Sequence, residues 1–147
     1  MPTGYFGIGI EHVKTGYNVG TLWRSASILG AAFLFTIGRR YSPQSSDTSG
    51  AWKSIPLYNH DSFDEFYNAI PYDCVLVGVE MTERATPIRE YAHPPRAVYL
   101  LGSEDQGLTP AAMARCHHLI ALPGVGSLNV AVAGSIVMFD RHSKSPA

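Results

Sequence analysis

The sequence has 147 residues, of which 46% are hydrophobic and 16% are charged. A chain of this length folds as one domain with one core, and its low charge content argues against intrinsic disorder. Eleven lysines and arginines oppose twelve acidic residues, which gives a net charge of −1. The overall charge therefore gives no sign of a nucleic-acid partner. Any contact with RNA must come from a local patch or from a dimer surface.

The first half of the chain alternates apolar runs with helical patterns. The runs Tyr5–Ile10 and Ala31–Ile37 are continuously apolar, which is typical of buried parallel strands. Between them, apolar residues recur at helical spacing and predict a helix over Asn18–Leu29, with Asn18 as its cap and Gly30 at its end. The remaining predictions for this half are a polar loop over Arg39–Gly50, a short edge strand over Ile55–Tyr58, and a helix over Asp61–Ile70 capped by Asp61.

The second half continues the alternation. Thr109 and Pro110 are typical of a helix start, and Ser127 is predicted to cap a final helix that runs to about Arg141. Strands that alternate with helices predict one α/β domain, residues 1–147, with a mainly parallel sheet flanked by helices. The other predicted segments are strands over Cys74–Val79, Ala97–Leu101 and Leu119–Leu122, an irregular segment or short helical turn over Met81–His93, a tight loop over Pro123–Gly126, and a frayed polar tail over Ser143–Ala147.

Several classes of protein are disfavoured by the sequence. Cys74 and Cys116 form neither a zinc pattern nor a disulfide framework, so we expect reduced thiols and no metal. Met1–Ile10 does not resemble a secretion signal, and the apolar runs are too short to cross a bilayer, so we expect no membrane partner. These features together predict a cytoplasmic protein.

Three polar clusters lie where a strand or loop meets a helix, the place where open α/β sheets bind ligands. Taken alone, each is explained by a helix cap, a turn or a packed helix start. Asn129 is the exception, because a polar group at an apolar helix start needs a partner. The clusters are Asn18-Val19-Gly20-Thr21-Leu22-Trp23-Arg24, Leu101-Gly102-Ser103-Glu104-Asp105-Gln106-Gly107-Leu108, and Ser127-Leu128-Asn129-Val130.

Together and in this order, the three clusters resemble the motifs of the SpoU (TrmH-like) class of the SPOUT RNA methyltransferases, over nearly the whole chain. Asn18, Gly20 and Arg24 match N-x-G-x-x-x-R, the first motif. The resemblance implies a C-terminal trefoil knot, a homodimer, S-adenosylmethionine as methyl donor, and transfer to a ribose 2′-hydroxyl of RNA, with tRNA favoured over rRNA for so small a domain. It also implies donor contacts from Leu101, Gly102, Glu104, Ile120, Leu122, Leu128 and Val130.

The resemblance names Asn18, Arg24, Glu104, Ser127 and Asn129 as the residues that serve catalysis. A general base must first lose its own proton, and the guanidinium group of arginine keeps its proton at neutral pH. We therefore expect Arg24 to grip a phosphate beside the reacting hydroxyl, while a phosphate oxygen or a water takes the proton. Asn18 and Glu104 would order the loops and position Arg24, and Ser127 and Asn129 would bind the ribose or the donor.

Other features leave two questions open. Arg39, Arg40 and Lys53 flank the polar loop and are either an RNA-binding patch together with Arg24 or an ordinary solvated surface. The final helix is apolar on more than one side, which favours a dimer interface. The alternative function is a non-catalytic nucleotide- or RNA-binding α/β module, because Gly7-Ile8-Gly9 is a fragment of a dinucleotide-binding fingerprint.

Overall fold

The computed structural model describes residues 4–38 and 54–144. Seven strands form one sheet in the order β3-β2-β1-β6-β4-β7-β5, and every pair of neighbouring strands is parallel. The predicted α/β class and parallel sheet are confirmed. The elements are β1 (Tyr5–Glu11), α1 (Gly16–Leu29), β2 (Phe33–Ile37), β3 (Leu57–His60), α2 (Phe63–Asn68), β4 (Val75–Val79), β5 (Thr86–Pro87), η2 (Ile88–Glu90), β6 (Arg96–Leu101), α3 (Pro110–Arg115), β7 (His118–Ala121) and α4 (Val130–Lys144).

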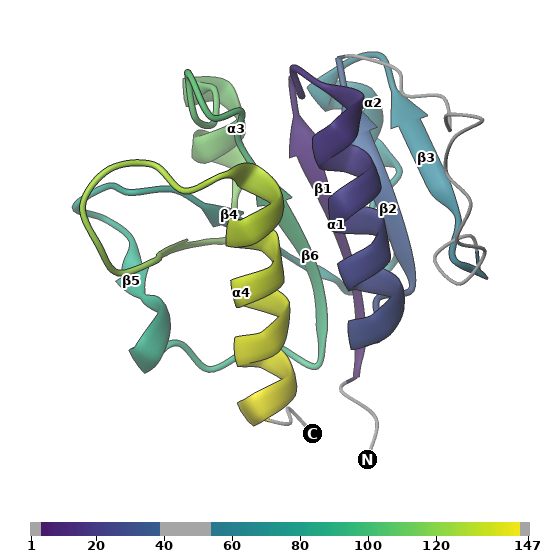
Figure 1. The fold of residues 1–147 in the computed structure, drawn as a ribbon. Helices are drawn as coiled ribbons and strands as arrows, with labels where there is room; N and C mark the ends of the chain where they lie inside the picture. The colour runs from purple at the N-terminus through teal and green to yellow at the C-terminus, as the bar shows by residue number, and fades with distance from the viewer. Residues whose placement is uncertain (1–3, 39–53, 145–147) are drawn as a thin grey trace.

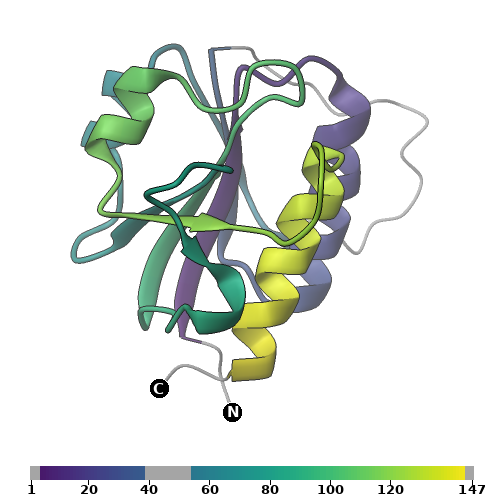
Figure 2. The ribbon, with the colours of Figure 1, turned by 90° about the vertical axis from the view of Figure 1, so that its left-hand side faces the viewer.

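Helices cover both faces of the sheet, so the domain has three layers. Figure 1 shows α1 and α4 side by side over one face, and Figure 2 shows α2 and α3 on the other. Each face carries its own core, because side chains of a strand alternate between the two sides. In β1, Phe6, Ile8 and Ile10 pack beneath α1 and α4.

The glycines of β1 are packing positions. A Cβ atom on Gly7 would lie 2.2 Å from the ring of Phe33, and one on Gly9 would lie 2.4 Å from the ring of Phe35. Side chains there would collide with the aromatic residues that fill the α2 face of the sheet. The Gly7-Ile8-Gly9 run therefore lies inside a strand and has a structural explanation, which removes the main sequence support for a dinucleotide-binding module.

Helix α4 packs closely against α1. Gly134 leaves room for Leu22, since a Cβ atom at this position would approach Leu22 Cδ1 to 2.5 Å. The hydroxyl of Ser135 donates to that of Ser25 at 2.9 Å across the same contact. Small residues at both positions allow the two helix backbones to approach, so the start of α4 lies beside the start of α1.

The far end of α4 is anchored by a buried polar network. Arg141 is fully buried and donates to the carbonyl oxygens of Pro94 and Pro95 and to the Tyr99 hydroxyl, at 2.7, 2.9 and 3.0 Å. His93 Nε2 lies 2.7 Å from Asp140. Lys144 binds Asp140 at 2.9 Å and the carbonyl of Ile88 at 2.6 Å. The helix is thereby fixed to the segment that joins η2 to β6.

The network also corrects the expected tail. Ser143 and Lys144 belong to α4, and only residues 145–147 of the predicted frayed segment lie outside the described residues. Helix formation continues through Lys144 because its ammonium group is held by backbone carbonyls of the η2 segment.

Three predicted helix caps are also wrong. Helix α1 begins at Gly16, so Asn18 lies within its first turn. Ser62, one residue after Asp61, caps α2 by accepting from Glu65 N. Asn129 caps α4: its Oδ1 accepts from the amides of Ala131 and Val132 at 2.9 and 3.2 Å, a role predicted for Ser127. The caps predicted at Gly30 and Thr109 are confirmed; Gly30 adopts a left-handed conformation with φ 93°.

Other differences are smaller. The irregular segment 81–93 contains the short strand β5 and the 3-10 turn η2, and β5 pairs with β7 at one edge of the sheet. The edge position predicted for the strand near Pro56 is confirmed, with the strand shifted to Leu57–His60. No helix in residues 4–38 and 54–144 is long and apolar enough to cross a membrane.

Candidate functional site

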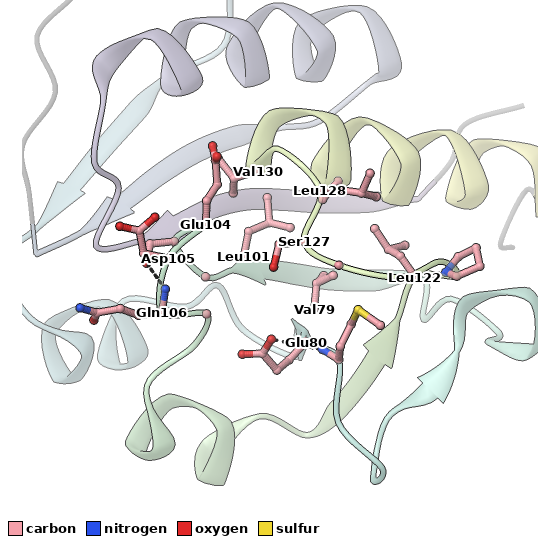
Figure 3. A pocket seen from close by; sticks show the side chains of 17 residues that line it. Val79, Glu80, Leu101, Glu104, Asp105, Gln106, Leu122, Ser127, Leu128 and Val130 are labelled. Atoms are coloured by element: carbon pink, nitrogen blue, oxygen red, sulfur yellow. Dashed lines mark hydrogen bonds between the residues drawn. The ribbon is translucent and has the colours of Figure 1, made fainter.

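A pocket of about 350 Å³ opens at the carboxyl ends of β4, β6 and β7. Its walls are the loops that follow these strands, together with the first turn of α4. Figure 3 shows Val79, Leu101 and Ser127 near its centre, between Glu104 on one side and Glu80 on the other. The volume is within the range of pockets that bind small molecules. The position agrees with the expectation that ligands bind at the carboxyl edge of a parallel sheet.

The pocket has apolar walls and an acidic rim. Val79, Leu101, Leu122, Leu128 and Val130 contribute the apolar surface. The charged side chains among the lining residues are Glu80, Glu104 and Asp105, and no lysine or arginine in residues 4–38 and 54–144 lines it. A pocket of this kind suits an apolar ring system that carries positive charge, and it repels a phosphate group.

The three sequence clusters meet at the rim of this pocket. Asn18 Nδ2 donates to Glu104 Oε1 at 2.8 Å. Asn129 Nδ2 donates to Asn18 Oδ1 at 3.0 Å and to Glu104 Oε1 at 3.2 Å. The orientation of the Asn129 amide is set, because its Oδ1 accepts from the amides of α4 and only its nitrogen can face the other two side chains.

Two further carboxylates, which the sequence analysis missed, hold the loop after β6. Glu80 Oε2 accepts from Leu108 N at 2.8 Å. Glu11, with 1% of its surface exposed, accepts from Thr109 N at 2.9 Å and from the Thr109 hydroxyl at 2.8 Å. Glu11 is the last residue of β1 and Glu80 directly follows β4, so an acid at the end of an apolar run was the signal that could have identified them.

The same loop depends on two glycines of the second cluster. Gly107 has φ +68°, a conformation that disfavours other residues, and its amide donates to the Ser103 carbonyl at 2.8 Å. A Cβ atom on Gly102 would lie 2.2 Å from the carbonyl carbon of Gly107. The turn from Ser103 to Gly107 therefore lies directly against the end of β6, where it forms one wall of the pocket.

Lys14 and Asp105 form an ion pair between the segment before α1 and the turn after β6. Both side chains are more than half exposed, so solvent screens the pair and its contribution to stability is small. The position of the pair matters more. Lys14 offsets the charge of Asp105, and Glu80 and Glu104 are the other carboxylates of the pocket.

Most of the predicted donor-binding residues line the pocket. The exception is Ile120, whose side chain is fully buried in the core between sheet and helices. Its carbonyl oxygen accepts from Glu80 N at 3.0 Å and so helps to place the acidic wall. Ser127 lines the pocket and is exposed. The predicted residues that line the pocket are Leu101, Gly102, Glu104, Leu122, Leu128 and Val130.

Arg24 lies outside this pocket. It is exposed, and it makes no hydrogen bond or ion pair with any residue of the described chain. It shares one outward stripe of α1 with Tyr17, Thr21 and Ile28, which follow at helical spacing. The predicted positioning of Arg24 by Asn18 and Glu104 has no contact to support it within one chain.

The outward stripe of α1 adjoins an apolar surface on α4. Val132, Ile136 and Phe139 are 46%, 37% and 62% exposed, and with Thr21 they line a shallow depression. We call the stripe and these three residues the outer face, defined by Tyr17, Thr21, Arg24, Ile28, Val132, Ile136 and Phe139. Large apolar side chains gathered on one face are typical of an interface with another protein.

The other candidate residues with polar or reactive side chains are three basic residues and the cysteine and histidines around the start of β7. Arg39, Arg40 and Lys53 fall outside the described residues. His117 Nδ1 accepts from Leu76 N at 2.8 Å, and His118 pairs with the Tyr91 hydroxyl at the same distance. Burial, with a smaller effect from Glu11, raises the pKa of Cys116 to about 12. Within residues 4–38 and 54–144, no group of histidines, cysteines and acids could hold a metal ion.

Comparison with known proteins gives matches along most of the chain. Residues 6–139 match the family described as the SpoU rRNA Methylase family. The tRNA (guanosine(18)-2′-O)-methyltransferase of Escherichia coli strain K12 is 23% identical over 139 residues, which cover 90% of this chain and 61% of the relative. The chain spans less than two thirds of the length of the first curated relatives it matches.

Solved structures share the fold. The SpoU methyltransferase AviRb from Streptomyces viridochromogenes, in complex with the cofactor AdoMet, superposes with a TM-score of 0.85 at 24% identity, over 95% of this chain and 57% of AviRb. A structure described as "Structural insights into the 2-OH methylation of C/U34 on tRNA" gives a TM-score of 0.80 at 24% identity, with 97% of both chains covered. At these identities the likeness establishes the fold.

Proposed function

The chain belongs to the SpoU rRNA methylase family, and we propose from this premise that it transfers a methyl group from S-adenosylmethionine to a ribose 2′-hydroxyl of RNA. One observation carries the proposal. Asn18, Glu104 and Asn129, one from each sequence cluster, are joined by hydrogen bonds at the rim of a single pocket. Residues so far apart in sequence are brought to one place, as a shared catalytic role requires.

The pocket suits the methyl donor. Its apolar walls match an adenine ring, and its acidic rim matches a ligand with a sulfonium and an ammonium group. The turn 103–107 and the glycines behind it supply backbone groups at the end of β6, where a bent ligand can lie. A phosphorylated nucleotide or flavin fits less well, because the lining carboxylates repel phosphate. This charge pattern favours the methyltransferase over a nucleotide-binding module.

When bound, the donor supplies a methyl group on a positively charged sulfur, which accepts the electrons of the broken bond. The protein must then orient the ribose oxygen and help it to lose its proton. We assign Arg24 to the phosphate beside that ribose, where its positive charge lowers the pKa of the hydroxyl. The proton passes to a phosphate oxygen or a water. Asn18, Glu104 and Asn129 hold the rim, and Ser127 is free to bind the ribose or the donor.

The position of Arg24 supports a homodimer. Within one chain the guanidinium is on the outer face and does not line the pocket. We propose that two copies pair through their outer faces, so that Arg24 of one protomer serves an RNA site shared with its partner. The exposed Val132, Ile136 and Phe139 would then be buried, which stabilises the dimer by removing apolar surface from water.

The substrate we propose is tRNA. The structure that aligns with this chain over 97% of both lengths is described in terms of C/U34 on tRNA, which supports this choice. Arg39, Arg40 and Lys53 remain our proposed RNA-binding patch together with Arg24. A cytoplasmic location follows from an RNA substrate of this class.

We also propose the C-terminal trefoil knot. The segment between β4 and β6 runs outside β7, because β5 pairs with the outer edge of β7. The chain enters β7 from α3 on one face of the sheet and leaves it for α4 on the other. The C-terminal segment thus passes from one face of the sheet to the other inside the connection between β4 and β6. Threading of this segment through a knot needs such a path.

The test is a transfer assay with the purified protein, donor labelled in its methyl group, and separate tRNA and rRNA pools. We expect label in tRNA, and we expect mass spectrometry of nuclease digests to find a 2′-O-methyl nucleoside. Calorimetry with the donor tests the pocket independently of the RNA. Absence of donor binding would contradict the proposed activity, while labelled rRNA with unlabelled tRNA would contradict only the choice of substrate.

A further inference from the structure

The proposed function assigns the acidic rim to the donor as a whole and gives Glu80 no role of its own. Glu80 directly follows β4 and lies across the pocket from Glu104, with Leu101 and Ser127 between them (Figure 3). Its Oε2 accepts from Leu108 N at 2.8 Å and its Oε1 from Met81 N at 3.2 Å. These backbone bonds fix the carboxylate in place, and neither of them neutralises it.

The other two carboxylates of the pocket are engaged differently. Asp105 pairs with Lys14, which cancels its charge. Glu104 accepts from the side-chain amides of Asn18 and Asn129 and is part of the rim. Among the described residues, Glu80 is therefore the pocket carboxylate that has neither a cation nor a side-chain donor as partner. Each of its oxygens retains a lone pair for a ligand.

We propose that Glu80 recognises the positive charge of the methyl donor and so makes the pocket bind the donor more tightly than the spent product. The inference rests on the proposed function. The donor carries a net charge of about +1 at neutral pH, from a sulfonium, an ammonium and a carboxylate. Methyl transfer turns the sulfonium into a neutral thioether, so the product has no net charge. A fixed, partly enclosed carboxylate favours the charged ligand and weakens binding once the charge is lost.

The experiment measures two ligands on the full chain by calorimetry. Sinefungin is a stable donor analogue with an ammonium group in place of the sulfonium, and S-adenosylhomocysteine is the neutral product. Glu80→Gln removes the charge and keeps one oxygen that can accept from Leu108 N, while its amide nitrogen gives up the longer bond from Met81 N. Glu90→Gln, at an exposed position of η2, is the matched control. We expect Glu80→Gln to weaken sinefungin about tenfold and the product less than about twofold, and Glu90→Gln to change neither.

The ratio of the two affinities separates charge recognition from a structural role. If Glu80 only shapes the turn 103–107, both ligands will weaken by the same factor, and the inference is overturned. It is also overturned if Glu80→Gln binds both ligands as the wild type does, and in that case the proposed function stands. If the wild type binds neither ligand, the proposed function fails together with the inference. Higher salt should lower the wild-type ratio of sinefungin affinity to product affinity, towards the ratio measured for Glu80→Gln.

Discussion

Asn18 and Glu104 are 86 positions apart in the sequence, and the Asn18 amide donates a 2.8 Å hydrogen bond to the Glu104 carboxylate. Asn129 closes the triangle from the start of α4. The three residues come from three loops, so their contact holds the rim of the pocket together. The pairing of two neutral amides with one ionised acid also keeps the rim polar without adding a second charge.

The first prediction concerns this triangle. Asn129→Asp keeps an oxygen that can cap α4, but it removes the nitrogen that donates to Asn18 and Glu104 and places a second carboxylate there. We expect the free energy of unfolding to fall by about 1–3 kcal/mol and methyl transfer to fall at least about tenfold. Urea unfolding and the transfer assay measure the two effects. Asn68→Asp, at the exposed end of α2, is the control and should change neither.

The second prediction separates Arg24 from donor binding. Since Arg24 does not line the pocket, Arg24→Ala should leave the affinity for the donor unchanged. Turnover should fall by about 100-fold or more, because the positive charge at the phosphate beside the reacting hydroxyl is lost. Arg24→Lys should recover part of the rate, since it keeps the charge and loses the planar fork. Near-normal turnover of Arg24→Ala would remove this residue from the mechanism.

The third prediction tests the outer face. Phe139→Glu places a charge on the proposed interface, at a side chain that is 62% exposed in one chain and can be changed without disturbing the core. We expect sedimentation to report a monomer and transfer to fall at least about tenfold. Tyr72→Glu, at a more exposed aromatic residue before β4, is the control and should remain dimeric. A wild-type protein that is already monomeric would contradict the dimer directly.

The fourth prediction follows from His93. Burial lowers the pKa of this imidazole from 6.5, although the bond with Asp140 opposes the shift. The unfolded chain therefore takes up a proton at His93 more readily than the folded chain. The contribution of His93 to stability is complete above pH 6.5 and is lost as the pH falls through the folded pKa.

We therefore expect the free energy of unfolding to decrease between about pH 7.5 and about pH 5.5, and this decrease to be smaller in His93→Gln. His142→Gln, at an exposed position of α4, is the control substitution. Urea titrations at each pH provide the measurement. Equal slopes in His93→Gln and the wild type would show that other groups set the pH dependence.

The sequence predicted the order of the main elements and the parallel sheet, because continuous apolar runs and helical spacing are local signals. It also predicted that the three clusters would meet, since the carboxyl ends of parallel strands share one edge. The helix caps were harder. Asn18, Asp61 and Ser127 are all good caps by type, yet Ser62 and Asn129 cap α2 and α4, and Thr15 precedes α1 without a side-chain capping bond. Neighbouring polar residues compete for one role, and packing decides between them.

The site could be predicted only in part. Apolar residues next to a motif were assigned to the pocket, and Ile120 shows the limit of this approach, since a strand residue two positions before a pocket residue can be buried in the core. Glu11 and Glu80 were missed because each is a single acid outside the motifs, and only the folded loop shows that they hold adjacent amides. The outward position of Arg24 depends on the rotation of α1 against the sheet, which a motif does not specify.

The attachment of α4 has a consequence for synthesis of the protein. This helix supplies Val130 and Ala133 to the pocket, and it is fixed in place by Arg141 and Lys144 near its end. On the ribosome, the strands and α1 emerge well before these anchoring residues do. A nascent chain that stops short of Arg141 lacks the contacts that fix α4, so the pocket wall formed by Val130 and Ala133 depends on some of the last residues to be made.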